Sequence, residues 1–268
     1  MTNTANNASR ERLIFALDVG GGLEEALSWV DRLGNHVGLF KVGKESFVRY
    51  GTEIVGQIHA RGGKVFLDLK FHDIPHTVAR AAEAAFELGV AMFNVHALGG
   101  RRMMIDTISA VSQLAEGRGK PRPIVLAVTV LTSLNDDDLR TMGFNGGTRE
   151  TALNLARLAQ DAGVSGVVAS AEDAAAIRAA CGSQFLIVTP GIRGMKTVAG
   201  DDQKRIVAPR EAVGRGADYL VVGRPIRQAA DPAGEADAIV GEIAGGLALR
   251  ERAHDPGDAA SAGTMIRR

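Results

Sequence analysis

The segment VFLDLKFHDIPHTV, residues 65–78, begins like a buried strand of a parallel sheet and ends in charged residues. Its first three residues are apolar, which is typical of a strand that is covered on both faces. Successive side chains of a strand point to opposite faces, so Asp68 and Lys70 are predicted to share one face. Leu67 and Leu69 would then lie on the other, apolar face. The segment therefore predicts a core strand that carries a charged pair at its carboxyl end.

Short apolar runs of this kind recur along the chain and alternate with longer Ala-rich amphipathic stretches, as expected of repeated βα units. We predict eight strands, at residues 13–18, 37–42, 64–70, 91–96, 124–130, 165–170, 184–189 and 218–222. The predicted helices cover residues 23–34, 45–61, 76–88, 101–115, 149–162, 172–180, 209–215 and 233–248. Eight such units in about 250 residues predict an α/β protein with a single-domain (β/α)8 TIM barrel. A doubly wound sheet is the alternative, but FALDVGGG (15–22) lacks the GxGxxG spacing that usually follows its first strand.

Composition narrows the classes of partner. The 268 residues are 46% hydrophobic, and 31 basic residues balance 31 acidic ones, which gives no electrostatic reason to expect nucleic acid or a membrane surface. The single cysteine, Cys181, excludes an intramolecular disulfide, and no Cys/His pattern indicates zinc. The N-terminal residues lack the apolar core of a secretion signal, and no run approaches the ~20 apolar residues of a membrane span. We expect a cytoplasmic protein with its barrel at residues 12–248 and disordered tails at 1–11 and 249–268.

Polar residues follow most of the predicted strands, at the end where barrel active sites lie. They are Asp18, Lys41, Asp68, Lys70, Asn94, His96, Thr129, Thr132 and Ser133. Such residues could instead have a purely structural role. Asp68 and Lys70 could form a structural ion pair, and Asp73 could cap a helix or occupy a turn. Several charges at one barrel mouth are harder to explain in that way, because burial of an ion pair usually costs more in desolvation than its attraction returns. Their convergence favours a polar ligand.

Two glycine-containing segments follow the last two predicted strands. They are TPGIRGM at 189–195 and VVGRPI at 221–226. Barrels commonly bind phosphate at these two positions, through loop amides and the N-terminus of a short helix. Gly191 and Gly223 would allow close approach of the backbone, while Arg193 and Arg224 would supply charged donors. The residues alone thus predict a phosphorylated small molecule whose reacting end lies against a lysine and carboxylates.

Seven segments together resemble one known family, in order and with compatible spacing. They are FALDV, KVGKESF, FLDLKFHDIPHTV, NVHALGG, AVTVLTS, VTPGIR and DYLVVGRPI, spread over residues 13–235. They closely resemble the orotidine 5′-phosphate decarboxylase family, and the central DxKxxDIP pattern is highly specific. The resemblance implies a homodimeric barrel that converts orotidine 5′-monophosphate to uridine 5′-monophosphate, the last step of de novo pyrimidine nucleotide synthesis, with no metal or organic cofactor.

The same resemblance implies roles for individual residues. The implied catalytic residues are Lys70, Asp68, Asp73 and Lys41. Lys70 would donate the proton to C6 of the pyrimidine, and Asp68 would lie beside the departing carboxylate. Among the implied substrate-binding residues, Asp18 and Lys41 belong to the charged network and hold the ribose, while Thr132 and Ser133 contact the pyrimidine. Asp73, Ile74 and Thr77 would reach into the partner's site. The implied phosphate-site residues are Arg193, Gln203, Gly223 and Arg224. The chain departs from the family pattern at Gly194 and in GDDQKR, which leaves the placement of Gln203 open.

Two other functions remain as alternatives. One is a Mg²⁺-dependent sugar-phosphate decarboxylase or aldolase of the same barrel superfamily, against which the KFHDIP and LTS segments argue. The other is a catalytically silent barrel that binds a nucleotide or phosphate, for which the charge set around Lys70 would be unnecessary. We expect a structural or solvent role for the nearby histidines, and no chemistry from Cys181. These histidines are His72, His76 and His96.

Overall fold

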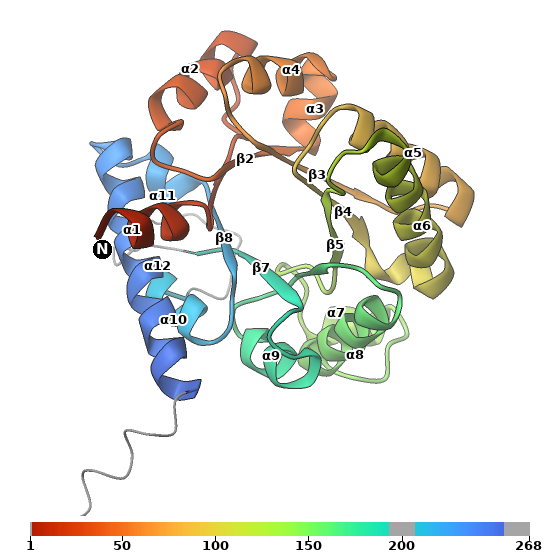
Figure 1. Cartoon of the computed structure of the whole chain (residues 1–268). Helices are drawn as coiled ribbons and strands as arrows, with labels where there is room; N and C mark the ends of the chain where they lie inside the picture. Colours follow the sequence, from red (N-terminus) through yellow and green to blue (C-terminus); the bar gives the residue numbers. More distant parts are fainter. Residues whose placement is uncertain (1, 193–206, 255–268) are drawn as a thin grey trace, which may run out of the picture.

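The computed structural model describes residues 2–192 and 207–254, and its centre is a closed parallel barrel (Figure 1). Eight strands pair in sequential order, and the last pairs with the first. They are β1 (Leu13–Ala16), β2 (Leu39–Gly43), β3 (Val65–Phe71), β4 (Met92–His96), β5 (Ile124–Val128), β6 (Gly166–Val168), β7 (Leu186–Pro190) and β8 (Tyr219–Val222). All eight predicted strands are therefore present, and the predicted TIM barrel is confirmed.

Helices surround the barrel, as repeated βα units require (Figure 1). They are α1 (Thr2–Arg10), α2 (Leu23–Leu33), α3 (Lys44–Tyr50), α4 (Glu53–Ala60), α5 (Pro75–Glu87), the 3₁₀ turn η1 (Ala97–Gly99), α6 (Gly100–Arg118), α7 (Asp136–Thr141), α8 (Thr148–Asp161), α9 (Ala174–Cys181), α10 (Pro209–Gly214), α11 (Arg224–Arg227) and α12 (Pro232–His254). The single helix predicted at 45–61 is two helices, because the chain breaks at Gly51 with φ of +60°. Every other predicted helix has its counterpart.

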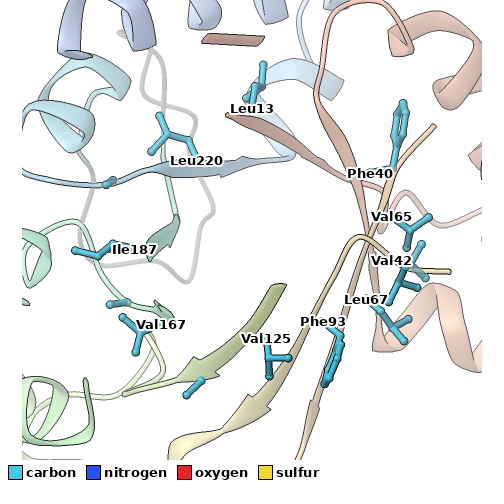
Figure 2. Close-up of a cluster of buried hydrophobic side chains, with 14 of the residues drawn as sticks. Leu13, Phe40, Val42, Val65, Leu67, Phe93, Val125, Val167, Ile187 and Leu220 are labelled. Carbon is cyan, nitrogen blue, oxygen red and sulfur yellow. The ribbon is translucent and has the colours of Figure 1, made fainter. Parts of the chain in front are cut away.

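Alternation along each strand separates two apolar cores. Outward-facing side chains such as Phe40, Leu67 and Phe93 pack against the helices and belong to the larger core (Figure 2). Inward-facing residues, one from nearly every strand, form a smaller cluster that fills the lumen: Ile14, Leu39, Phe66, Met92, Leu126, Val188 and Val221. Two residues further along β2, β3 and β4 the same inward face carries Lys41, Asp68 and Asn94. The apolar cluster therefore packs directly beneath this polar layer inside the barrel.

Both predicted tails are partly helical, which corrects the sequence prediction. Helix α1 occupies most of residues 1–11 and lies against α12, with Ser9 buried (Figure 1). Helix α12 continues past the predicted domain end at residue 248 to His254. The polar composition of residues 1–11 did not predict this packing, because a short helix can bury one face and remain polar on the others. The rest of the predicted C-terminal tail, 255–268, lies outside the described residues.

A buried aspartate ties the amino-terminal end of the barrel together. Asp218, immediately before β8, is 5% exposed. Its Oδ2 accepts hydrogen bonds from Arg178 and from the backbone N–H of Ile187, at 2.5 and 2.9 Å. Its Oδ1 lies 3.2 Å from a guanidinium nitrogen of Arg250 and 3.8 Å from one of Arg12. This cluster joins the strands to α9 and α12 at the face opposite the polar layer.

Candidate active site

Four charged residues form a continuous chain of ion pairs at the carboxyl ends of the first three strands. Lys41 Nζ lies 2.6 Å from Asp18 Oδ2 and 3.2 Å from Asp68 Oδ2. Lys70 Nζ lies 2.6 Å from Asp68 Oδ1. The structure therefore brings together Asp18, Lys41, Asp68 and Lys70, and Asp68 bridges the two ammonium groups.

The network keeps its inner members charged. Burial alone would lower the pKa of Lys41, but the carboxylates of Asp68 and Asp18 outweigh it and leave that pKa above its usual value. Burial alone would likewise raise the pKa of Asp68, whereas Lys41 and Lys70, with a hydrogen bond from Asn94, hold it below its usual value. Lys41 is thus held as an ammonium and Asp68 as a carboxylate at neutral pH.

Lys70 has an unusual backbone for a strand residue. Its φ is +53°, and among the described residues it is the one non-glycine with positive φ. This left-handed conformation costs a non-glycine residue about 1–2 kcal/mol. Simple alternation, which predicts that Asp68 and Lys70 share a face, does not foresee this turn. The side chains nevertheless meet, as the 2.6 Å contact between them shows.

Asn94 and Gly43 support this charged network from neighbouring strands. The fully buried Asn94 side chain donates from Nδ2 to Asp68 Oδ1 at 2.7 Å and accepts the Lys70 backbone N–H at 2.8 Å. Gly43 ends β2, and a Cβ there would lie 2.4 Å from Asp18 Oδ1, so only glycine leaves room for that carboxylate. The sequence singled out Asn94 as a polar strand-end residue but gave it no specific role, and it gave no role to Gly43, which follows Lys41 by two residues.

Two cavities meet at Lys41 and Val221. The larger, of 270 Å³, is lined by Ala16, Asp18, Lys41, Gly191, Ile192, Val221, Gly223, Arg224, Pro225 and Arg227. The smaller, of 150 Å³, is more apolar and is lined by Lys41, Phe66, Asp68, Lys70, Val128, Val130, Leu131, Thr132, Val168, Ala169, Pro190 and Val221. One compartment is thus polar and cationic, and the other is a mostly apolar slot with the charged network at one side.

The larger cavity has the composition of an anion site. Arg224 and Arg227 of α11 line it together with Gly191 and Gly223. Arg227 also donates to the backbone carbonyl oxygen of Asp18 at 3.0 Å, which ties α11 to the end of β1. We did not predict Arg227, which lies three residues after Arg224 on the same short helix. The predicted residues Arg193 and Gln203 lie outside the described residues.

Other predicted site residues lie apart from the cavities of their own chain. Asp73, Ile74 and Thr77 are exposed at the start of α5, and Asp73 Oδ1 accepts the N–H of Ile74 at 2.6 Å. Thr132 lines the smaller cavity, whereas its neighbour Ser133 is exposed and lines neither. The single chain thus assembles the network and both cavities but leaves the DIP segment facing outward.

The three nearby histidines line neither cavity. The rings of His72 and His96 stack with centroids 5.3 Å apart. Burial, followed by His72, Lys70 and Lys44, lowers the pKa of His96 to about 4, so this imidazole is neutral at pH 7. Its Nδ1 accepts the Leu98 N–H at 3.3 Å. Within residues 2–192 and 207–254, no group of three or more His, Cys, Asp or Glu side chains is placed to hold a metal ion.

Known proteins resemble this chain over most of its length. A family model described as "Orotidine 5'-phosphate decarboxylase / HUMPS family" matches residues 11–239. The orotidine 5′-phosphate decarboxylase of Syntrophus aciditrophicus is 63% identical over 251 residues, covering 93% of this chain and 100% of the relative. The enzyme of the same name from Geotalea daltonii is 51% identical over 238 residues, covering 89% of this chain and 98% of the relative. The crystal structure of the Lactobacillus acidophilus orotidine 5′-phosphate decarboxylase is similar with a TM-score of 0.75 at 36% identity, covering 86% of this chain and 98% of that one.

Proposed function

The chain belongs to the orotidine 5′-phosphate decarboxylase family, and from that membership we propose how its site performs the reaction. It converts orotidine 5′-monophosphate to uridine 5′-monophosphate and carbon dioxide, the last step of pyrimidine nucleotide synthesis. The observation that carries the proposed mechanism is the Lys70 ammonium, held 2.6 Å from Asp68 beside an apolar slot. The catalytic domain is the (β/α)8 barrel.

The chemistry requires electrostatic stabilisation. When the bond from C6 to the carboxylate breaks, carbon dioxide leaves and the electron pair stays on C6 in an orbital that the ring cannot delocalise. The ammonium of Lys70 attracts this developing carbanion more strongly than the starting ring, and so lowers the barrier. Lys70 then donates a proton to C6, which forms the C6–H bond of the product, and solvent returns the proton to the lysine. No electron-accepting cofactor enters this sequence.

Asp68 has two parts in this mechanism. Its carboxylate orients Lys70 and, with Lys41 on its other oxygen, keeps the network at fixed geometry. It also lies beside the substrate carboxylate, whose repulsion is relieved when carbon dioxide leaves, although preorganised attraction is the stronger argument for rate. Lys41 and Asp73 are the other two proposed catalytic residues. Asp18 and Lys41 also hold the ribose hydroxyls.

The two cavities divide the substrate between them. The pyrimidine occupies the apolar slot and contacts Thr132 and Ser133, and the 5′-phosphate occupies the cationic cavity at Gly223 and Arg224. Arg193 and Gln203, which lie outside the described residues, are further proposed phosphate ligands. Binding energy from the phosphate, which does not react, can then be used to place C6 against Lys70.

The outward-facing DIP segment belongs to a second subunit's site. Asp73 and Thr77 are exposed and contribute nothing to their own cavities, and the neighbouring Ile74 is an apolar side chain with 66% exposure. Val48 and Leu98 are further exposed apolar side chains. They follow β2 and β4, the strands on either side of β3. These features support a homodimer in which Asp73, Ile74 and Thr77 complete the partner's site.

The cellular setting follows from the pathway. Every helix in the described part of the chain is too short or too polar to cross a membrane. Cys181 is a free, buried thiol. A place in nucleotide synthesis and a free thiol support a cytoplasmic enzyme, without nucleic acid or membrane as a partner.

One assay tests the proposal against its enzymatic alternative. The purified chain should convert orotidine 5′-monophosphate to uridine 5′-monophosphate, followed as a loss of absorbance, at the same rate with and without EDTA. A chain that is inert towards this substrate would refute the proposed function. Activity that EDTA abolishes would favour the Mg²⁺-dependent class of mechanism instead.

A further inference from the structure

The strained turn at Lys70 coincides with an irregularity in the sheet. Between β3 and β4, Leu67 pairs with Phe93 and Phe71 pairs with Val95. Four steps along β3 therefore match two along β4, so the residues between Leu67 and Phe71 bulge from the regular ladder. Lys70 lies in this bulge with its φ of +53°. Its backbone N–H no longer has a ladder partner and requires another acceptor in this partly buried site.

Asn94 of β4 supplies that acceptor. Its Oδ1 receives the Lys70 N–H at 2.8 Å, and its side chain is fully buried. Because the backbone N–H can only donate, the amide oxygen must face Lys70, and the amide nitrogen then faces the other way. That nitrogen donates to Asp68 Oδ1 at 2.7 Å, the same oxygen that contacts Lys70 Nζ. One amide thus binds both the backbone of the reacting lysine and the carboxylate that orients its ammonium.

We propose that Asn94 is a positioning residue for decarboxylation, which holds the β3 bulge so that the Lys70 ammonium and the Asp68 carboxylate keep their reactive geometry. The inference rests on the proposed role of Lys70. Asn94 lines neither cavity, so it acts through Lys70 and Asp68 and not on the substrate.

The residue type fits this task better than its near relatives. Leucine would fill a similar volume, but it would leave the Lys70 N–H without its acceptor and remove one of the two hydrogen bonds to Asp68 Oδ1. Aspartate would keep an acceptor for the Lys70 N–H, but its second oxygen would face Asp68 and two carboxylates would repel each other. At neutral pH, only an amide of this length presents an acceptor and a donor in the two required directions.

The test compares Asn94→Leu and Asn94→Asp with a matched control, Thr107→Val. Thr107 is also a fully buried polar residue, but it lies on α6 and its hydroxyl bonds within that helix. We expect kcat of Asn94→Leu to fall roughly 10²-fold, as for a small misplacement of a catalytic group. Its KM, and its Kd for uridine 5′-monophosphate, should stay within about threefold of wild type, because the ring and phosphate contacts remain. Thr107→Val should behave like wild type.

A pH profile of Asn94→Asp separates positioning from general damage. The charged and titratable groups around this amide are Asp68 and Lys70 on β3, Lys41 on β2 and, beyond Lys70, the stacked His72 and His96. As pH falls, the introduced carboxyl at position 94 gains a proton and can again donate to Asp68, so kcat relative to wild type should rise. This isosteric variant carries the test alone if the leucine variant does not fold.

Two results would overturn the inference. One is a kcat within twofold of wild type in an Asn94→Leu variant that binds uridine 5′-monophosphate normally. The other is an Asn94→Asp variant whose kcat relative to wild type does not change with pH. Inactivity of wild type itself would refute the proposed function instead, so the two failures are distinguishable.

Discussion

The carboxylate of Asp18 occupies the space that a side chain on Gly43 would need. A Cβ built on Gly43 would lie 2.4 and 2.6 Å from the two Asp18 oxygens, closer than real Cβ atoms approach other atoms. The end of β2 therefore has to be glycine for Asp18 to reach Lys41 at 2.6 Å. The charged network therefore requires a residue without a side chain at position 43, in addition to the four charged side chains.

This relationship predicts the effect of Gly43→Ala. The added methyl group should displace the Asp18 carboxylate from Lys41 and lower kcat/KM by about 10-fold or more, equivalent to at least ~1.4 kcal/mol of lost transition-state stabilisation. Gly56→Ala is the matched control, because Gly56 lies on α4 and a Cβ there meets nothing within 4 Å. Steady-state kinetics on both variants checks the prediction, and equal activities would contradict it.

His96 should make the free energy of unfolding decrease as the pH falls from 6.5 to about 4. Its pKa is about 4 in the fold against a usual 6.5, so between these values the unfolded chain takes up a proton that the folded chain does not. Stability from this group is complete above pH 6.5 and is lost as pH falls towards 4, at up to ~1.4 kcal/mol per pH unit. Urea unfolding should show a shallower decline for His96→Asn, and identical slopes for both proteins would contradict this assignment.

The Asp218 cluster should affect stability without affecting catalysis. Removal of its charge leaves buried arginine groups without their counter-ion, so Asp218→Asn should lower the free energy of unfolding by about 3 kcal/mol. Asp237→Asn is the control, since its contact with His36 is exposed and should contribute less than about 1 kcal/mol. Because Asp218 lies at the opposite end of the barrel, kcat should not change. A large loss of kcat in a folded variant would refute this separation.

Sharing of the active site between subunits can be tested by complementation. Lys70→Ala and Asp73→Asn homodimers should each be nearly inactive. Mixed dimers contain one site with both residues intact, so random exchange should restore about a quarter of wild-type activity. The measurement is activity after mixing, with subunit exchange shown by differently tagged chains. Proven exchange without recovery would remove the role of Asp73 in the partner's site.

The fold could be predicted from sequence because its signals are local and repeated. Apolar runs such as the one before Asp68 marked every strand, and the count of eight fixed the barrel. The errors lie where packing between distant segments decides the outcome: α1 looked like a polar tail but lies against α12. The break at Gly51 also passed unnoticed within an amphipathic stretch.

The site was predictable in part for the same reason. Strand ends and alternation placed Asp68 and Lys70 together, and the ion pairs with Lys41 and Asp18 confirm that these four charges converge. The left-handed turn at Lys70 could not be predicted, because it depends on the register of β3 against β4. The support from Asn94 and the space at Gly43 were missed because each is visible only across neighbouring strands. The cross-subunit role of Asp73 stays a prediction.

Lys70 carries the central claim, and one measurement tests it most directly. Conversion of orotidine 5′-monophosphate should be compared between wild type, Lys70→Ala and Lys64→Ala. Lys64 lies just before β3, at the opposite end of the barrel, where its ammonium contacts Glu11. We predict that Lys70→Ala loses roughly 10⁴-fold or more in kcat, through loss of the stabilising charge and the proton donor together. Lys64→Ala should retain wild-type activity. A folded Lys70→Ala variant that decarboxylates within tenfold of the wild-type rate would contradict the account.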